Sequence, residues 1–208
     1  TEPTIFFEYA YDTAVLAREA GLKNVFVSNG YITTEALEKI APYLDAANID
    51  LKAFSEKFYR DVTGASLAGV LDCLRDYHRL GIWLEVTTLL IPEHNDAHEE
   101  LQAMASFIVD ELGVETPWHV TAFYPTYRMN DVPPTSAKTL LRARRIGQEA
   151  GLHYVYTGNV ADVEGESTFC PQCGALVIER RGFRLGTCRL NQGKCSECGA
   201  RIAGVGLD

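Results

Sequence analysis

The sequence lacks any long hydrophobic run. None of its apolar stretches approaches the roughly 20 residues that a helix needs to span a bilayer. Apolar residues still make up 47% of the chain and charged residues 23%, which is typical of a folded domain with a core. The composition therefore predicts a folded protein without a membrane partner, and 208 residues allow one ordinary domain with a small appendage.

The chain is also short of positive charge. Its 19 lysines and arginines face 28 aspartates and glutamates, so the formal net charge is −9. Phosphate contacts require a basic surface, so nucleic acid is not expected as a general partner. The exception lies between residues 179 and 201, where six basic and two acidic residues give a local net charge of +4 and leave −13 for the remaining residues.

Cysteine is almost absent from the first 169 residues, where Cys73 stands alone in a helical segment. The other five cysteines lie between residues 170 and 198. A secreted protein would distribute its disulfides through the fold, so this clustering favours a cytoplasmic protein with a metal site at one end. Cys73 is expected to be a small core residue.

Two C-x-x-C pairs make up the cysteine-rich segment. Two such turns can complete a tetrahedron of sulfur around one metal ion, and a glycine follows each pair, as a tight turn requires. We expect structural zinc here, with rubredoxin-like iron as the alternative, and we expect the ion to supply much of the folding energy of this small segment. Cys188 is expected to be a spare thiol. The predicted ligands are Cys170, Cys173, Cys195 and Cys198.

Strand and helix patterns alternate along the body of the chain. A helical pattern at residues 5–20, with Ile5, Tyr9 and Leu16 on one face, precedes five apolar stretches with strand character. Short helical segments separate these stretches, and this alternation predicts a parallel α/β sheet built from βαβ units. The strand-like stretches are residues 24–30, 46–52, 83–92, 118–125 and 153–159.

The predicted domain organisation has three parts. Residues 1–160 carry the α/β pattern, and residues 161–168, which are small and polar, are expected to form a linker. Residues 169–208 are expected to form a separate four-cysteine ribbon, similar to a zinc ribbon or a rubredoxin.

Distinctive polar residues follow the predicted strands. Ligands of parallel α/β sheets bind at the carboxyl ends of the strands, so these residues predict a binding site. Asp50 and Lys52 lie on the same side of a strand and could bind the carboxylate and ammonium groups of an amino-acid-like ligand. Two alternatives remain, a Schiff base on Lys52 and a merely hydrated strand end.

Five segments, in this order, carry a resemblance to a known family: TEPT, VSNG, NIDLKAFSEKFYRDVTGAS, WLEVTTLLIPEHND and HVTAFYP. The chain resembles the radical S-adenosylmethionine (SAM) enzymes. Within them it is most similar to the pyruvate formate-lyase activating enzyme-like branch, and there to the radical SAM enzymes of the AmmeMemoRadiSam system. The resemblance extends from Thr1 through the paired C-x-x-C tail.

The resemblance implies a partial (β/α)6 barrel and a radical reaction. In this family a [4Fe–4S] cluster binds SAM and cleaves it reductively, and the resulting 5′-deoxyadenosyl radical abstracts a hydrogen atom. The implied partners are SAM, a protein or small-molecule substrate, and an electron donor such as flavodoxin or ferredoxin.

The resemblance also implies positions for SAM binding. Thr1–Pro3 would meet the methionyl amino group, Asp50 and Lys52 would lie near the methionyl carboxylate, and Leu90–Asn95 would lie near the adenine and ribose. The full set of implied cofactor-binding residues is Thr1, Glu2, Pro3, Ser28, Asn29, Asp50, Lys52, Leu90, Asn95 and Tyr127.

Two departures from the family pattern matter. The cluster-binding C-x-x-x-C-x-x-C motif is absent, so we expect it upstream of Thr1, and we expect the chain alone to be inactive and to contain no catalytic residue. Tyr127 stands where the activating enzymes have a histidine, which puts that contact in question. The alternative function is a non-catalytic module whose basic four-cysteine tail binds a partner protein or nucleic acid.

Overall fold

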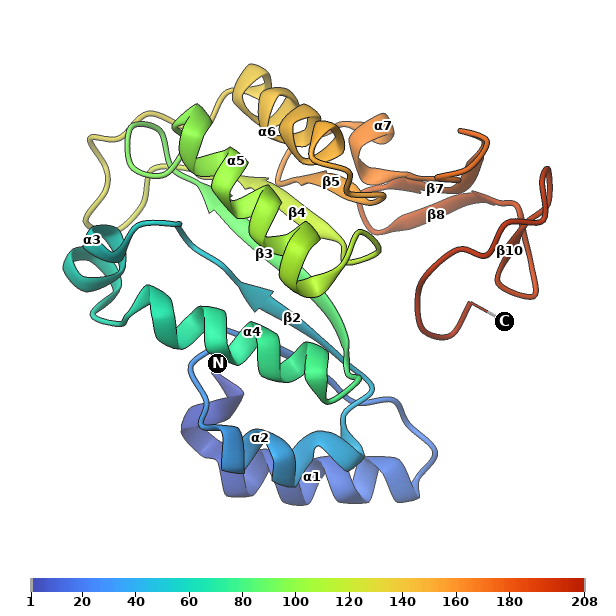
Figure 1. Ribbon diagram of the computed structural model, residues 1–208, viewed down its shortest axis with the longest axis horizontal. Coiled ribbons are helices and arrows are strands. Elements are labelled where there is room, and N and C mark those ends of the chain that lie inside the picture. The colour runs from blue at the N-terminus through green and yellow to red at the C-terminus, as the bar shows by residue number, and fades with distance from the viewer. Residues whose placement is uncertain (1, 208) are drawn as a thin grey trace. The chain divides into compact units, whose positions relative to one another are not determined.

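The computed structural model describes residues 2–207 and contains two compact units, Thr1–Thr88 and Leu89–Asp208 (Figure 1). Thr1, one of the predicted cofactor-binding residues, lies outside the described residues. Within residues 2–207, no helix has both the length and the apolar composition that crossing a bilayer requires.

The first unit is built from parallel strands joined by helices. Val25 pairs with Ala46, and Ala46 pairs with Trp83, so three successive strands run in the same direction. The strands are β1 (Val25–Ser28), β2 (Ala46–Asp50) and most of β3 (Trp83–Leu90). The helical segments are η1 (Pro3–Phe6), α1 (Phe7–Glu19), α2 (Thr34–Ile40), η2 (Ala41–Tyr43), α3 (Glu56–Phe58), the π-helical η3 (Tyr59–Thr63) and α4 (Leu67–Arg79).

Local sequence signals explain where these helices begin. The side chains of Thr33 and Ser66 accept hydrogen bonds from the backbone N–H groups at the starts of α2 and α4, as N-cap residues do. Behind the caps, α2 and α4 bury apolar residues at helical spacing, among them Leu37, Ile40 and Leu74. Cys73 is also buried, which confirms its prediction as a core residue.

The predicted apolar face of the first helix is wrong. Ile5, Tyr9 and Leu16 are all exposed, at 73%, 78% and 66%. The helix uses its other side, where Ala14 is buried and the ring of Tyr11 meets the ring of Tyr43 edge-on at 5.4 Å. The exposed side chains are as apolar as the buried ones, so helical periodicity alone did not identify the packed face.

The second unit continues the α/β pattern. The hydrogen-bonded order of the five long strands is β1-β2-β3-β4-β5, and β4 pairs with β5 in parallel. This confirms the predicted α/β class and its parallel sheet. The elements are β4 (Trp118–Ala122), β5 (Val155–Gly158), α5 (His98–Phe107), the π-helical η4 (Ile108–Leu112), α6 (Ala137–Glu149) and α7 (Val163–Glu166).

Helix α6 packs very closely on its strands. A Cβ atom on Gly147 would lie 2.9 Å from a methyl group of Val155 and 3.0 Å from the ring of Trp118. Any side chain at this position would therefore push the helix away from the buried Trp118.

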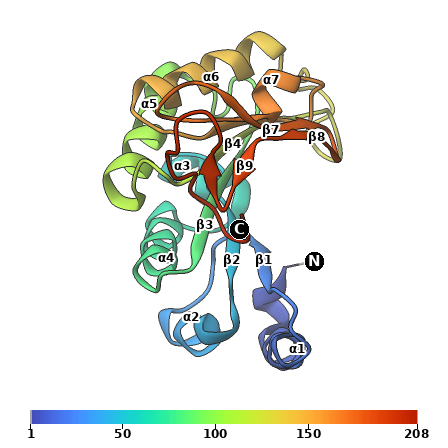
Figure 2. The ribbon, with the colours of Figure 1, turned by 90° about the vertical axis from the view of Figure 1, so that its right-hand side faces the viewer.

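The C-terminal segment is made of short antiparallel strands. Strands β6 (Thr168–Phe169), β7 (Leu176–Arg181) and β8 (Arg184–Cys188) form one sheet, and β7 and β8 lie side by side (Figures 1 and 2). Strands β9 (Leu190–Asn191) and β10 (Lys194–Cys195) form a second hairpin.

Residues 161–168, which are expected to form a linker, contain a short helix. They include α7, and the side chain of Asp162 accepts a hydrogen bond from the N–H of Gly165 at its start. The following segment shares a core with the body, because Tyr154 packs in one cluster with Val177, Ile178 and Ile202. The predicted domain boundary near residues 161–168 remains a prediction. The boundary between the two compact units lies between residues 88 and 89.

Candidate functional site

The carboxylate of Glu2 forms hydrogen bonds with residues at the end of strand β1. Glu2, Thr4, Ser28 and Asn29 together are called the Glu2 clasp. Its Oε2 atom accepts hydrogen bonds from the backbone N–H of Asn29 at 2.8 Å and from the Asn29 side chain at 2.9 Å. Its Oε1 atom accepts from the Ser28 hydroxyl at 2.7 Å and from the Thr4 hydroxyl at 2.9 Å. Three predicted site residues, Glu2, Ser28 and Asn29, are therefore in direct contact.

These hydrogen bonds also determine the charge state of Glu2. Partial burial raises the pKa of this carboxyl, but hydrogen bonds from Asn29, Ser28 and Thr4 outweigh burial, so the pKa is lower than usual. Ser28 is buried, whereas Asn29 is exposed and Pro3 is half-buried in the first turn of η1. Because its oxygens are already engaged, Glu2 orders the strand end, and Asn29 is the exposed member of the clasp.

Asp50 and Lys52 form an ion pair at the end of strand β2. The Lys52 ammonium nitrogen lies 2.7 Å from Asp50 Oδ2, and about a third of each side chain is exposed. The phenol oxygen of Tyr59 accepts a hydrogen bond of 3.0 Å from the Lys52 backbone N–H. Both charged groups are thus fixed in place but accessible to a ligand.

Tyr59 is a site residue that the sequence pattern did not single out. Its side chain is buried, and burial raises the pKa of the phenol to about 12. It stands at the start of the π-helical turn η3, and such turns are frequent at functional sites. Nothing in the residue spacing shows that this phenol turns back toward the strand end.

In the second unit, Asn95 shapes the loop that follows β3. Its Oδ1 atom accepts a hydrogen bond of 2.6 Å from the N–H of Ile91, and its side-chain amide donates to the Leu89 carbonyl at 2.8 Å. Asn95 and Leu90 are both buried. Contacts between this segment and a ligand would therefore come from the loop backbone or from its exposed residues, such as Glu93.

Side chains also tie together the ends of β4 and β5. The Tyr124 hydroxyl donates to the Asn159 carbonyl at 2.9 Å, and the Asn159 amide donates to the Ala122 carbonyl at 3.0 Å. Tyr127 is 78% exposed, and the Arg128 guanidinium lies 5.1 Å from the centre of its ring. Tyr127 is thus presented outward from a loop that hydrogen bonds hold in place.

A residue with positive φ follows each of the strands β3, β4 and β5. Glu93, Tyr127 and Asn159 have φ values of 67°, 52° and 60°, in the left-handed region that residues other than glycine seldom adopt. Such outliers cluster at functional sites. The predicted residues thus fall into two groups, one in each unit, and their convergence on a single ligand remains a prediction.

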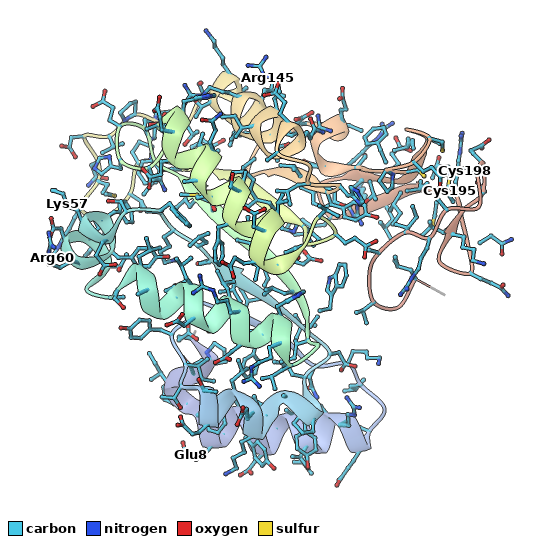
Figure 3. All side chains as sticks on the ribbon, viewed as in Figure 1. Glu8, Lys57, Arg60, Arg145, Cys195 and Cys198 are labelled. Carbon is cyan, nitrogen blue, oxygen red and sulfur yellow. The ribbon has the colours of Figure 1, made fainter. Side chains whose placement is uncertain are left out.

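Four sulfur atoms come together in the C-terminal segment. The Sγ atoms of Cys170, Cys173, Cys195 and Cys198 all lie within 4.8 Å of one another, and Figure 3 shows Cys195 and Cys198 close together. Cys170 lies 3.6 Å from Cys198, and Cys173 lies 3.8 Å from Cys195. Metal–sulfur bonds of about 2.3 Å in a tetrahedron would place the sulfurs roughly 3.8 Å apart. The predicted grouping of these four cysteines is confirmed, whereas metal binding and the identity of the metal stay predictions.

The two C-x-x-C turns have the same local geometry. Gly174 donates its N–H to the Cys170 carbonyl at 2.9 Å, and Gly199 donates to the Cys195 carbonyl at 2.8 Å. Both glycines have φ near +75°, which a side chain would disfavour. Burial raises the pKa of Cys170, but the backbone N–H groups of Cys173 and Gln172 outweigh it and lower the pKa to about 7. This favours the thiolate, which is the form that binds metal, at Cys170 alone. At Cys173 the backbone N–H of Ala175 lowers the pKa, but hydrogen bonds with the neighbouring thiols and burial outweigh it and raise the pKa to about 12.

A parallel sheet with helices between its strands, followed by a group of four cysteines that could hold a metal ion, defines an α/β protein with a small four-cysteine unit. The model of the Radical SAM superfamily matches residues 1–107, slightly more than half of the chain. The chain therefore belongs to the radical SAM superfamily.

Individual proteins are also similar to this chain. An uncharacterized protein of Methanocaldococcus jannaschii is 47% identical over 97% of the chain, and the pyruvate formate-lyase-activating enzyme of Clostridium pasteurianum is 23% identical over 59%. A domain of the pyruvate-formate lyase-activating enzyme of Bacteroides vulgatus shares the fold over 76% of this chain and 95% of its own, with a TM-score of 0.68 at 14% identity. The chain spans 60% of the length of the M. jannaschii protein and 53% of the C. pasteurianum enzyme.

Proposed function

We propose that this chain forms the SAM-binding part of a radical SAM enzyme similar to the pyruvate formate-lyase activating enzymes. The observation that carries the proposal is the superfamily match over residues 1–107, which include the Glu2 clasp and the Asp50–Lys52 pair. The reaction proposed for the parent protein is reductive cleavage of SAM, followed by hydrogen abstraction from a protein or a small molecule. The electron would come from a flavodoxin or ferredoxin.

The cysteines of this chain do not fit the iron–sulfur cluster of that reaction. A [4Fe–4S] cluster with one open iron needs three thiolates. Among residues 2–207, four cysteines belong to the C-terminal group, Cys73 is buried in α4, and Cys188 is exposed on β8. We therefore propose that the cluster ligands lie in a part of the parent protein outside this chain, and that the chain alone does not cleave SAM.

The role proposed for the Asp50–Lys52 pair follows from its charge. The methionine part of SAM carries a carboxylate and an ammonium group, which complement Lys52 and Asp50. The ion pair of 2.7 Å between Lys52 and Asp50 keeps both charged groups in position, and the Tyr59 phenol oxygen accepts a hydrogen bond from the Lys52 backbone N–H. The clasp of Glu2 presents Asn29 at the neighbouring strand end.

One experiment tests the SAM-binding role with this chain alone. Titration calorimetry would compare SAM binding by the wild type, Lys52→Ala and Lys57→Ala. Lys57 is a matched control because it is an exposed lysine on α3 that pairs with Asp61 and not with Asp50. We expect about tenfold weaker binding for Lys52→Ala only, from the loss of one charge-assisted hydrogen bond. Equal binding by all three proteins would contradict the assignment.

A second experiment tests the parent reaction. The coding region, extended upstream, would be expressed, reconstituted anaerobically with iron and sulfide, and reduced in the presence of SAM. We expect 5′-deoxyadenosine from the extended protein and none from the present chain. Formation of this product by the present chain would overturn the proposed place of the cluster ligands.

We propose zinc as the metal of the four-cysteine group, with rubredoxin-like iron as the alternative. The sulfur spacing fits both ions, because their bonds to thiolate are similar in length. Elemental analysis of the purified protein separates the two, and iron would also colour the protein red.

A further inference from the structure

We propose that the outer edge of strand β8 binds an extended acidic peptide segment of a partner protein by strand addition. This inference concerns the hairpin formed by β7 and β8, and it does not depend on the proposed radical chemistry.

Within the described residues 2–207, strand β8 pairs with a neighbouring strand on one side only. In the order β6-β7-β8 it is an edge strand, and all of its residues, Arg184–Cys188, are exposed. The N–H groups of Thr187 and Arg189 point toward β7, where they donate to the Glu179 carboxylate and the Val177 carbonyl. Because N–H directions alternate along a strand, Cys188, which lies between them, directs its N–H outward, whereas a β-bulge places both Gly186 and Thr187 opposite Glu179. Such an edge is a template for an incoming strand.

The same hairpin presents apolar side chains to solvent. Phe183, in the turn, is fully exposed, and Leu185, two residues further, is 73% exposed. Neither side chain contributes to the core of this segment, which Val177, Ile178 and Ile202 form with Tyr154. An aromatic ring exposed at a hairpin tip suits an anchor for a partner.

The charge around the edge determines the kind of partner. Arg181 and Arg184 flank the turn within the stretch of local charge +4, so an acidic partner is favoured. Two carboxylates lie close by, because Glu179 pairs with Arg181 at 2.7 Å and Glu166 accepts a hydrogen bond from Gly182. These acids would repel the continuous phosphate backbone of a nucleic acid, whereas a peptide can place its charges between them.

The hairpin is held rigidly enough to act as a preformed edge. Arg180 donates its backbone N–H to the Ser167 hydroxyl and its guanidinium to the Thr168 hydroxyl. The guanidinium also lies 5.7 Å from the centre of the Tyr156 ring. A fixed edge reduces the entropy lost on binding.

The test uses the full chain with its metal bound and a fluorescent peptide of four Glu-Val repeats, blocked at both ends. Fluorescence polarisation would compare wild type, Arg184→Glu and Arg145→Glu. Arg145 is an exposed arginine on α6, outside the hairpin (Figure 3). We expect Arg184→Glu to weaken binding about tenfold and Arg145→Glu to change it less than about twofold. No binding by the wild type, or equal losses in both variants, would overturn the proposal.

Two further probes test the mode of binding. One peptide is methylated on the backbone nitrogens of all its glutamates, and a second on those of all its valines. Because N–H directions alternate along a strand, each peptide has lost the hydrogen-bond donors of one edge. Strand addition predicts that one of them loses binding and the other keeps it, whereas equal affinities or equal losses would refute it. If a twelve-nucleotide oligothymidine binds more tightly than the peptide, the peptide proposal is overturned and the partner would be single-stranded nucleic acid.

Discussion

Loss of one metal ligand should unfold the C-terminal segment and leave the first unit intact. Cys198 is exposed, so Cys198→Ser removes a ligand without creating a cavity. The segment has a small core, in which the buried Val177, Ile178 and Ile202 together contribute on the order of 6 kcal/mol. A four-thiolate zinc ion contributes on the order of 10 kcal/mol at neutral pH. The metal ion therefore contributes more to the stability of the segment than its core does, and loss of one ligand should unfold the segment.

Hydrogen exchange measured by mass spectrometry tests this prediction. In Cys198→Ser we expect protection to fall at least about tenfold in peptides from residues 169–207, together with loss of bound metal, because opening of the segment costs less. Protection in α2 and α4 should not change. Cys188→Ser is the matched control, since Cys188 is also exposed but lies outside the sulfur group. The reasoning is wrong if Cys198→Ser keeps its protection, or if Cys188→Ser loses as much.

Three further predictions concern stability, and urea unfolding measures each. Leu74→Ala should lower the free energy of unfolding by about 2–5 kcal/mol because Leu74 is fully buried. Leu16→Ala, on the exposed face of α1, should lower it by less than about 1 kcal/mol. Gly147→Ala should cost about 1–3 kcal/mol, since its Cβ would meet Trp118 and Val155, and a neutral result would show that α6 can shift. The folded pKa of Glu2 is lowered, so its contribution is present above the unfolded pKa and is lost as pH falls through the folded value. Glu2→Gln should therefore show a smaller loss of stability than wild type between pH 6 and pH 3, and identical pH dependence would contradict this.

Much of the candidate site could be predicted because it rests on local signals. Two C-x-x-C turns, each followed by glycine, bring two thiolates together within a few residues, so the pairing required only that the turns meet. The strand-end position of Asp50 and Lys52 follows from strand alternation, and their ion pair joins neighbours on one face. The role of Asn95 was less accessible, because an asparagine in a loop can face either a ligand or its own backbone. Here it bonds to Ile91 and Leu89.

The sequence by itself determined the α/β class, the parallel direction of the strands and the four-cysteine group, because these depend on periodicity and spacing along the chain. Only the tertiary structure decided which face of α1 is packed, that residues 161–168 are folded, and that Tyr59 supports Lys52. Each of these depends on contacts between residues distant in sequence or on the direction of a single side chain. Periodicity identifies an apolar face, but the neighbour that covers it, or leaves it exposed, is set by the packing of the whole fold.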